Sequence, residues 1–433
     1  MAGNSWLGIA QYWAAMQQPP SLKAIAPWEG FSDMYREQSR RGGIPWSPFL
    51  RWVLMGIPGR GLQEDAASIG ESREYWDPYW ESKRVDFSKI KIPSYVLASY
   101  SSMLHTMGSV RAFREINCSD KWLRFHPHQE WYEDYLHSSV DDLDRFFERY
   151  LKGEQNGWES TPKVRVSMYR YGQTVCTIPH RQQLLFLCWN CVELTCNCDP
   201  KYPVYDQVEE DYPIPRTQYT KLYLTAAKTM HISPSSTEAV HSYDSTTKGM
   251  VTYDFVFPER TTLAGYSKLR FFVSCKEHND LDIYVMLRKL SADGELMEQS
   301  NVPLHELPSH ITSVKDVANV NPTKYLGPTG MLRASHRAMD PEKSTEYLPF
   351  HPHLKPDYVN PGDVVPLDLG IWPMGIVFEK GEGLRLQISG KTMVLPEWDN
   401  PHVAHAEPKF NKGFHNVHLG GEYAESYLLV PKL

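Results

Sequence analysis

The sequence predicts an α/β part followed by an all-β part, and two observations carry that prediction. Residues 92–100 (IPSYVLASY) and 121–126 (KWLRFH) are apolar strand-like runs on either side of a helix-like segment, 108–116, which is the order of a parallel sheet. Further along, the chain changes to short alternating runs separated by Gly, Pro, Asn and Asp, as in a β-sandwich. We therefore predict an α/β part at 1–162 and a sandwich at 163–433.

The remaining elements of the first part follow from local patterns. The stretch GNSWLG is rich in small residues and delivers Ser5 to the head of an apolar helix, which Pro19-Pro20 ends. A short strand, SLKAIAP, follows it, and the aromatic, helical segment 28–87 is typical of an inserted cap. A long amphipathic helix over 140–153, ending at Gly153, completes this part.

The composition indicates a soluble multi-domain chain and argues against several classes of partner. Its 433 residues are 41% hydrophobic, which is enough apolar material for two cores. The formal net charge is -7. Basic residues are scattered rather than gathered in a stripe, so we expect no nucleic-acid partner. The start of the chain has neither signal-peptide regions nor a long apolar run, so we expect no membrane association and a cytoplasmic location.

Five of the seven cysteines fall in one stretch, VCTIPHRQQLLFLCWNCVELTCNC. A Cys-x-x-Cys pair followed by further thiolates is compatible with zinc, but the Cys-x-Cys end and the Leu-rich lead-in fit no zinc spacing. Val175-Cys176 can be encoded by a common 5′ splice-site sequence, and Leu194-Thr195 by a branch-point-like one. The favoured hypothesis is that an atypical insert at about 174–200 is a translated intron, which transcript sequencing would decide.

Sequence blocks in the same order along most of the chain resemble the cocaine-esterase and X-Pro dipeptidyl-peptidase-like (CocE/NonD) α/β-hydrolases. They are AGNSWLGIAQ, LKAIAPWEGFSDMYRE, YWESKRVDFSKIKIPSYVLASYSS, DKWLRFHPHQEW, RFFERYLKGEQNGWESTPKVRV, LRASHR, YVNPGDVV and LRLQISG. The resemblance implies an α/β-hydrolase domain with a helical cap, and a C-terminal jelly roll of the galactose-binding-like type. It also implies a Ser-His-Asp triad that acts on esters or on amide bonds after proline, and no cofactor.

Carried over residue by residue, the resemblance places Ser5 at the nucleophile position. The backbone N–H of Trp6 would then contribute to an oxyanion hole. The other interpretation of Ser5 is a helix N-cap, a role that serine fills well.

The base is expected just past the strand at 121–125. His126 is preferred because it ends the apolar run and precedes Pro127, and His128 is the alternative. His105, in SSMLHT, is a further candidate to line the site. Trp28 and Glu29, in the APWEG stretch, are also candidate pocket residues.

The acid is where the sequence departs from the family pattern. Related hydrolases usually place an aspartate after the strand IPSYVLA, where it orients the histidine. This chain reads Ser99-Tyr100-Ser101-Ser102 there, with Ser101 at the aspartate position. Glu130 and Asp33 are candidate substitutes, and the sequence does not rank them.

Two weaker patterns have ordinary structural explanations beside functional ones. Asp280 and Asp282 could suggest calcium, but KEHNDLDIYV is more typical of a turn entering a strand, so no metal is predicted. Aromatic residues of the cap could wall an apolar pocket or simply form a core. They are Trp46, Phe49, Trp52, Tyr75, Trp76, Tyr79 and Trp80.

The function predicted is a serine hydrolase that acts by acyl transfer on a small ester or a short X-Pro peptide. The alternative is a non-catalytic remnant whose jelly roll is a binding module, and the oligomeric state stays open. Because the chain starts two residues before Gly3, we expect that the strand ahead of Ser5 and a second oxyanion donor are missing. On that expectation Ser5 lies near a flexible terminus, and the chain is a truncated product with little activity.

Overall fold

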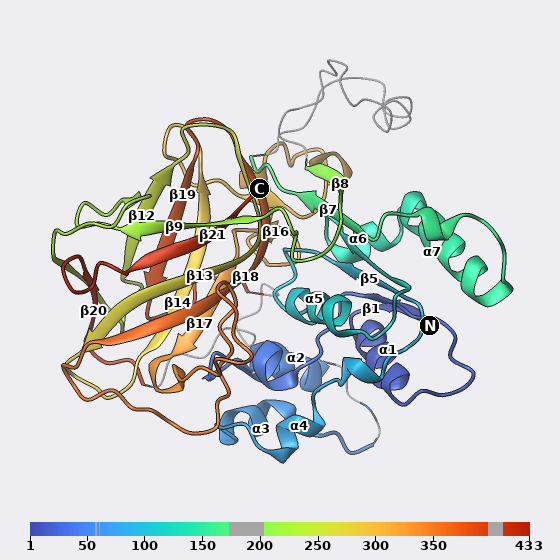
Figure 1. The fold of residues 1–433 in the computed structure, drawn as a ribbon, viewed down its shortest axis with the longest axis horizontal. Coiled ribbons are helices and arrows are strands. Elements are labelled where there is room, and N and C mark those ends of the chain that lie inside the picture. The colour runs from blue at the N-terminus through green and yellow to red at the C-terminus, as the bar shows by residue number, and fades with distance from the viewer. Residues whose placement is uncertain (57–58, 60, 173–202, 397–409) are drawn as a thin grey trace.

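The computed structural model describes residues 1–56, 59, 61–172, 203–396 and 410–433. The predicted insert at 174–200 therefore lies outside the described residues. Both predicted parts are present: a sheet flanked by helices comes first, and antiparallel sheets follow (Figure 1). Among the described helices, none combines the length and the apolar character that a bilayer crossing requires.

The first part is built on one six-stranded sheet with the order β1-β2-β5-β6-β7-β8. Its first five strands are parallel neighbours, and β8 runs antiparallel to β7. The strands are β1 (Ala2–Asn4), β2 (Ala26–Trp28), β5 (Ser94–Ala98), β6 (Lys121–Phe125), β7 (Val164–Met168) and β8 (Val204–Glu209). All five residues of β5 are buried, as the uninterrupted apolar run predicts for a central strand of a parallel sheet.

Helices surround this sheet and form the cap. They are α1 (Trp6–Met16), α2 (Pro48–Gly56), α3 (Ala66–Ser72), α4 (Pro78–Ser82), α5 (Thr106–Glu115), α6 (Glu130–Asp134) and α7 (His137–Phe147). Helices α2 to α4 lie within the predicted cap at 28–87, together with the two-residue strands β3 (Arg40–Arg41) and β4 (Ile44–Pro45). The predicted amphipathic helix is α7 and its π-helical continuation, which ends at Gly153 with a left-handed φ of 77°.

The second part has two larger antiparallel sheets. One has seven strands, in the order β10-β9-β21-β13-β20-β11 with β18 also paired to β13, and the other has the order β12-β19-β14-β17. The larger sheet contains β9 (Gln218–Leu224), β10 (Met230–His231), β11 (Ala239–Asp244), β13 (Thr261–Cys275), β18 (Val365–Phe378), β20 (Phe414–Leu419) and β21 (Tyr427–Lys432). The smaller contains β12 (Met250–Val256), β14 (Asp282–Leu290), β17 (Thr329–Arg333) and β19 (Gly383–Ser389), and β15 (Gln299–Ser300) pairs separately with β16 (Lys324–Tyr325).

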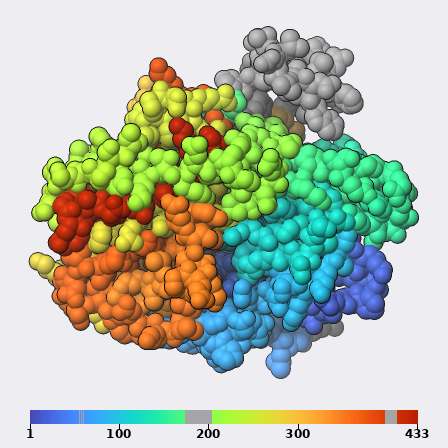
Figure 2. Space-filling model, viewed as in Figure 1, coloured from blue at the N-terminus to red at the C-terminus, as the bar shows by residue number. Residues whose placement is uncertain are grey.

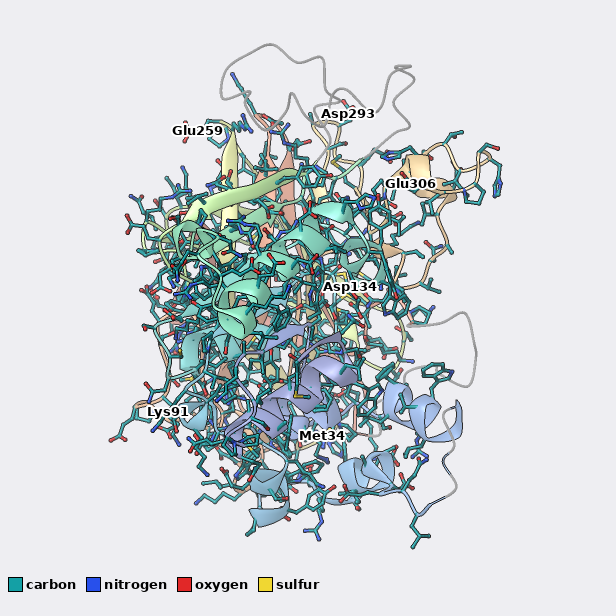
Figure 3. All side chains as sticks on the ribbon, turned by 90° about the vertical axis from the view of Figure 1, so that its right-hand side faces the viewer. Met34, Lys91, Asp134, Glu259, Asp293 and Glu306 are labelled. Carbon is teal, nitrogen blue, oxygen red and sulfur yellow. The ribbon has the colours of Figure 1, made fainter. Side chains whose placement is uncertain are left out.

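The first sheet continues beyond the boundary predicted at residue 162. Strands β7 and β8 pair with it, and the strands of the antiparallel sheets begin only at β9. One cluster of buried apolar side chains runs from Val96 and Phe125 in the first part to Leu269 and Leu386 in the second. The two parts therefore share a core, and Figure 3 shows side chains filling the space from Met34 in the first part to Glu259 in the second.

The two parts contact each other where the ring of Tyr100 packs closely on the backbone of Gly375. The ring of Tyr100 stacks on Phe125 at 4.3 Å between centroids, and it covers Gly375 of β18. A Cβ at Gly375 would lie 2.5 Å from the Tyr100 ring. Tyr169 N–H donates to the Gly375 carbonyl at 2.8 Å, and Val377 N–H donates back to the Tyr169 carbonyl at 2.9 Å. This junction fixes the loop that starts at Ser99, which belongs to the site described next.

Candidate active site

Ser5 lies on a sharp turn between β1 and α1. Its φ of 52° and ψ of -111° are a strained combination for a residue with a Cβ, and its N–H donates to the Trp28 carbonyl at 2.9 Å. The short strand β1 precedes Ser5, so the expectation that the strand ahead of it is missing is wrong. The turn needs small neighbours, because a Cβ at Gly3 would meet Leu7 Cβ at 2.5 Å. No side-chain bond from Ser5 caps α1, and the turn has the form of a nucleophile elbow.

His105 is the histidine that contacts Ser5. Its Nε2 lies 3.3 Å from Ser5 Oγ, and its Nδ1 lies 3.0 Å from Ser102 Oγ. The ring sits at the N-cap position of α5 and is 3% exposed, because the loop from β5 turns it back over the ends of the strands. We assign the tautomer from these contacts: Nδ1–H donates to Ser102 Oγ, and Nε2 accepts the proton of Ser5. A serine hydroxyl and a neighbouring neutral imidazole form a nucleophile–base pair.

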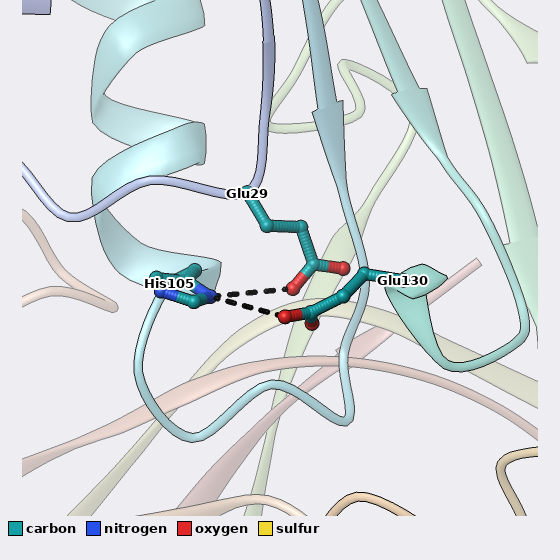
Figure 4. Close-up of side chains that lie close together, drawn as sticks. All are labelled: Glu29, His105 and Glu130. Atoms are coloured by element: carbon teal, nitrogen blue, oxygen red, sulfur yellow. Dashed lines mark ion pairs between the residues drawn. The ribbon is translucent and has the colours of Figure 1, made fainter. Parts of the chain in front are cut away.

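Two carboxylates lie on the Nδ1 side of His105 (Figure 4). Glu29 Oε2 is 3.7 Å from Nδ1, and Glu130 Oε1 is 3.9 Å from it. Glu29 follows β2 directly, in a left-handed conformation with φ 49°, and Glu130 begins α6 after β6. Because the carboxyl ends of parallel strands meet at one edge of a sheet, residues distant in the sequence converge here.

The Glu29 carboxylate is completely buried yet ionised. Burial by itself would raise its pKa, but its interactions with His105 and His126 hold the pKa well below the ordinary value. Oε1 of Glu29 lies 2.9 Å from His126 Nε2, in an electrostatic contact that lacks the alignment of a hydrogen bond. Glu29 thus places a negative charge between two imidazole rings.

Within the described part of the chain, neither His126, the base preferred from the sequence, nor His128, the alternative, is hydrogen-bonded to Ser5, although His126 contacts Glu29. His126 is fully buried; its Nδ1 lies 3.1 Å from the His128 carbonyl, and its ring faces Trp28 at 5.4 Å between centroids. His128 Nδ1 lies 2.9 Å from Glu133, whose pKa falls to about 2: burial raises it, but His128 and a neighbouring arginine outweigh that effect. Among the described residues, the histidine bonded to the Ser5 hydroxyl is His105.

The other predicted site residues divide between the site and the structure around it. Trp28 is fully buried in a core cluster rather than at the cavity, and Asp33 is bonded to Arg36 at 3.0 Å. Asp282 forms part of a buried pair with Arg333, and Asp280 accepts a hydrogen bond from Ser335. The sequence does not rank Glu130, and it offers His105 only as a residue that lines the site. Their common signal is position, since each follows one of two adjacent strands.

A small cavity opens at Ser5 and His105. Its volume is about 60 Å³, small beside the pockets that hold drug-sized ligands. The second part contributes to its wall, because Asn301 and Asn321 line it and the Asn301 carbonyl accepts from Gln129 N–H at 2.6 Å. The described residues lining it are Ser5, Phe49, Ser101, Ser102, Leu104, His105, Gln129, Glu130, Trp131, Asn301, Asn321 and Pro322. Of the cap aromatics named above, Phe49 reaches this cavity.

Two protein-family models match this chain. Residues 156–428 match the model of the X-Pro dipeptidyl-peptidase C-terminal non-catalytic domain, and residues 1–69 match that of the S15 family of X-Pro dipeptidyl-peptidases. The chain belongs to the X-Pro dipeptidyl-peptidase and CocE/NonD family of hydrolases. None of the curated protein sequences matches it.

Solved structures share the fold of this chain. A CocE/NonD family hydrolase from Staphylococcus aureus is 28% identical, with a TM-score of 0.84 over 100% of this chain and 71% of that one. An aminopeptidase from a marine sediment Thaumarchaeota archaeon, at 12% identity, and an α-amino acid ester hydrolase, at 13%, share the fold with TM-scores of 0.64. Each of these two alignments covers 100% of this chain and 76% of the other.

In this CocE/NonD family member, the side chains of Glu29, His105 and Glu130 also have the composition of a metal site. Among the described residues, Glu29, His105 and Glu130 form the group whose ligand atoms lie within 4.8 Å of one another. In the assigned tautomer, His105 Nδ1 faces the carboxylates and carries a proton that it donates to Ser102 Oγ. A protonated ring nitrogen cannot ligate a metal ion, so this tautomer favours a role in proton transfer.

Proposed function

We propose that this chain is a serine hydrolase in which Ser5 is the nucleophile and His105 is the base. The observation that carries the proposal is the 3.3 Å contact between Ser5 Oγ and His105 Nε2 on a strained turn. His105 Nε2 takes the hydroxyl proton as Oγ attacks the substrate carbonyl carbon, and the ring later returns that proton to the leaving oxygen or nitrogen. Water then cleaves the acyl-enzyme by the same steps.

Positive charge that develops on His105 is met by Glu29 and Glu130. Each lies within 4 Å of Nδ1, so both stabilise the imidazolium, while Ser102 Oγ holds the ring in orientation. The backbone N–H of Trp6, at the first position of α1, has no acceptor inside its own helix. We assign it to the oxyanion of the tetrahedral intermediate.

The proposal exchanges two positions of the family pattern. The resemblance implies an acid after the strand that is β5 and a histidine after the strand that is β6. This chain has His105 after β5 and Glu130 after β6. The exchange preserves the chemistry, since a triad is defined by the geometry of its groups and not by their order in the chain.

The substrate we propose is a small ester or an X-Pro peptide. The cavity of about 60 Å³ favours a short acyl group, and amides at Gln129, Asn301 and Asn321 offer hydrogen bonds to it. We also infer that the second part is the jelly roll implied by the resemblance, because consecutive strands pass between its two sheets, as from β12 to β13.

Active-site labelling tests the assignment. The chain is treated with a fluorophosphonate and the modified peptide is identified by mass spectrometry, for the wild type and for Ser5→Ala, His105→Gln and His126→Gln. We expect label on Ser5 in the wild type and in His126→Gln, and none in the other two. A folded wild type without label at Ser5 would favour the non-catalytic binding module, and label that persists in His105→Gln would reject His105 as the base.

Turnover measurements separate the substrate classes and the metal. An aryl acetate and a Gly-Pro arylamide distinguish esterase from dipeptidyl-peptidase activity. We expect unchanged rates after dialysis against EDTA, because the proposed steps need no metal ion. A loss of rate that zinc or another divalent ion restores would point instead to metal held by the two glutamates and His105.

A further inference from the structure

A second and larger cavity lies between the cap and helix α5 on one side and the antiparallel sheets on the other. Its volume is about 490 Å³, within the range of small-molecule sites. Its lining shares no residue with the cavity at Ser5. In Figure 2 the orange segment of the second part borders the blue and cyan segments of the first part.

The charges around this cavity are predominantly positive. Six cationic residues line it: Arg36, Arg41, Arg84, Arg111, Arg114 and Lys343. Three acidic residues, Asp33, Glu37 and Glu115, also line it. The lining therefore has three more positively charged side chains than negatively charged ones. Burial lowers the pKa of the two lining histidines, His351 and His353, so both are neutral at pH 7 and do not alter the count.

The acids engage part of the cationic set. Asp33 pairs with Arg36 at 3.0 Å, and Arg111 pairs with Glu115 at 3.0 Å and with Glu37 at 3.4 Å. Arg114 forms no ion pair with any described carboxylate, and it lies over the Tyr266 ring at 6.0 Å. Lys343 pairs with Asp340, and Arg84 lies 3.9 Å from Glu81. Both acids stand outside the cavity lining and offset part of its positive charge.

Arg41 places a buried guanidinium beside an aromatic wall. It is 3% exposed, its Cζ lies 3.8 Å from the centroid of the Trp372 ring, and it donates to the Met103 carbonyl at 3.2 Å. Phe350, Leu348 and Ile371 add apolar surface to the same lining. Cationic groups beside an aromatic and aliphatic wall suit a molecule with an acidic head and an apolar body.

We propose that this cavity binds a small organic anion, a carboxylate or phosphate ester with an aromatic or aliphatic body. The cationic excess supplies the recognition of the head, and charge-assisted hydrogen bonds from guanidinium groups are the stronger kind. The site stands independently of the chemistry proposed for Ser5. The second cavity and the site at Ser5 are both in contact with helix α5. His105 lies at the N-cap of that helix, while Met107, Arg111 and Arg114 line the second cavity.

Calorimetric titration with a matched set of probes tests this site on the full chain. The probes are 4-phenylbutyrate, its neutral amide and the corresponding amine, which share a body and differ in the charge of the head. We expect the carboxylate to bind at least about tenfold more tightly than the amide, and the amine not to bind. Equal affinity for carboxylate and amide would overturn the proposal.

Variants at exposed positions locate the bound probe without disturbing the core. Arg114→Gln and Lys343→Gln should each weaken the carboxylate by about threefold to tenfold and leave the amide unchanged. Lys276→Gln, an exposed lysine that does not line the cavity, is the matched control and should have no effect. Affinity that is unchanged in Arg114→Gln but strengthened in Glu130→Gln, which removes a negative charge beside Ser5, would place the probe at Ser5 and reject the second site.

Discussion

Glu29→Gln is the substitution that tests the proposed site most directly. It keeps the shape of the side chain and removes the charge that faces His105 Nδ1 at 3.7 Å. At an effective dielectric constant of about 20, a carboxylate and an imidazolium at this distance attract by about 4 kcal/mol. If that attraction develops fully in the transition state, its loss slows acylation by about 10³-fold.

The loss should be smaller than the total loss in His105→Gln. Ser102 still orients the ring, and Glu130 still lies 3.9 Å from Nδ1. We therefore expect a decrease of about 10²- to 10³-fold in kcat/KM, and a further decrease when Glu130→Gln is added. Because the pKa of Glu29 is held well below its ordinary value, its charge persists in mild acid and is lost only as pH falls through that low value. The charge that the variant removes should thus be present in the wild type at both pH 5 and pH 8.

The assay is the second-order rate of fluorophosphonate labelling, with aryl-ester hydrolysis as a second readout. Asp33→Asn is the matched control, since it also neutralises a buried carboxylate but one that faces Arg36. Both variants are first checked for unfolding midpoints. A folded Glu29→Gln protein that keeps its rate within about threefold, while His105→Gln is inactive, would refute the electrostatic role worked out here.

Three further predictions concern stability. Gly375→Ala should lower the free energy of unfolding by about 1–3 kcal/mol, because the new Cβ would lie 2.5 Å from the Tyr100 ring. Gly61→Ala is the control and should leave the free energy of unfolding unchanged, since the space around Gly61 is open. Equal effects of the two substitutions would contradict this prediction. Burial lowers the pKa of His415 to about 4, so the chain should lose about 3 kcal/mol as pH falls from about 6.5 to 4. His415→Gln should flatten that loss in urea titrations, and an unchanged slope would reject the assignment. Proteolytic cleavage at 155–163 should leave the fragments associated in gel filtration, because β7 and β8 complete the first sheet; separation into two folded halves would contradict the shared core.

The sequence predicts the architecture well wherever periodicity alone decides it. The runs at 92–100 and 121–126 became β5 and β6 around α5, because uninterrupted apolar residues suit strands buried on both faces. Residues 164–168 alternate like the sandwich strands and were assigned to the sandwich, yet they pair with β6. Alternation shows that a strand has a buried face, but it does not show which sheet buries that face.

The site was harder to predict because it depends on which strand ends meet. A histidine just past β6 satisfied the family order, so His126 was preferred, but its ring is turned toward Glu29 and Trp28. His105 lies seven residues beyond β5 at the start of a helix, and only the path of the intervening loop brings it to Ser5. The sequence identifies Glu29 as a pocket residue. Its left-handed backbone conformation, which aims the carboxylate inward, cannot be predicted from the residue being a glutamate.

The proposed exchange of base and acid is compatible with the topology of the sheet. Strands β5 and β6 are adjacent and parallel, so the loops after them leave the same edge, beside the turn that holds Ser5. A base from either loop can reach the serine, provided that an acid stands on the far side of its ring. In the proposed mechanism Glu29, after β2, would serve that purpose from a third strand end, and it contacts His126 as well as His105. A carboxylate that serves either histidine makes the site tolerant of the exchange, since the negative charge stays in place when the base moves from one loop to the other. On this argument, placing aspartate at Ser101 and glutamine at His105 would not restore the family order by itself, because His126 points away from Ser5 and toward that shared charge.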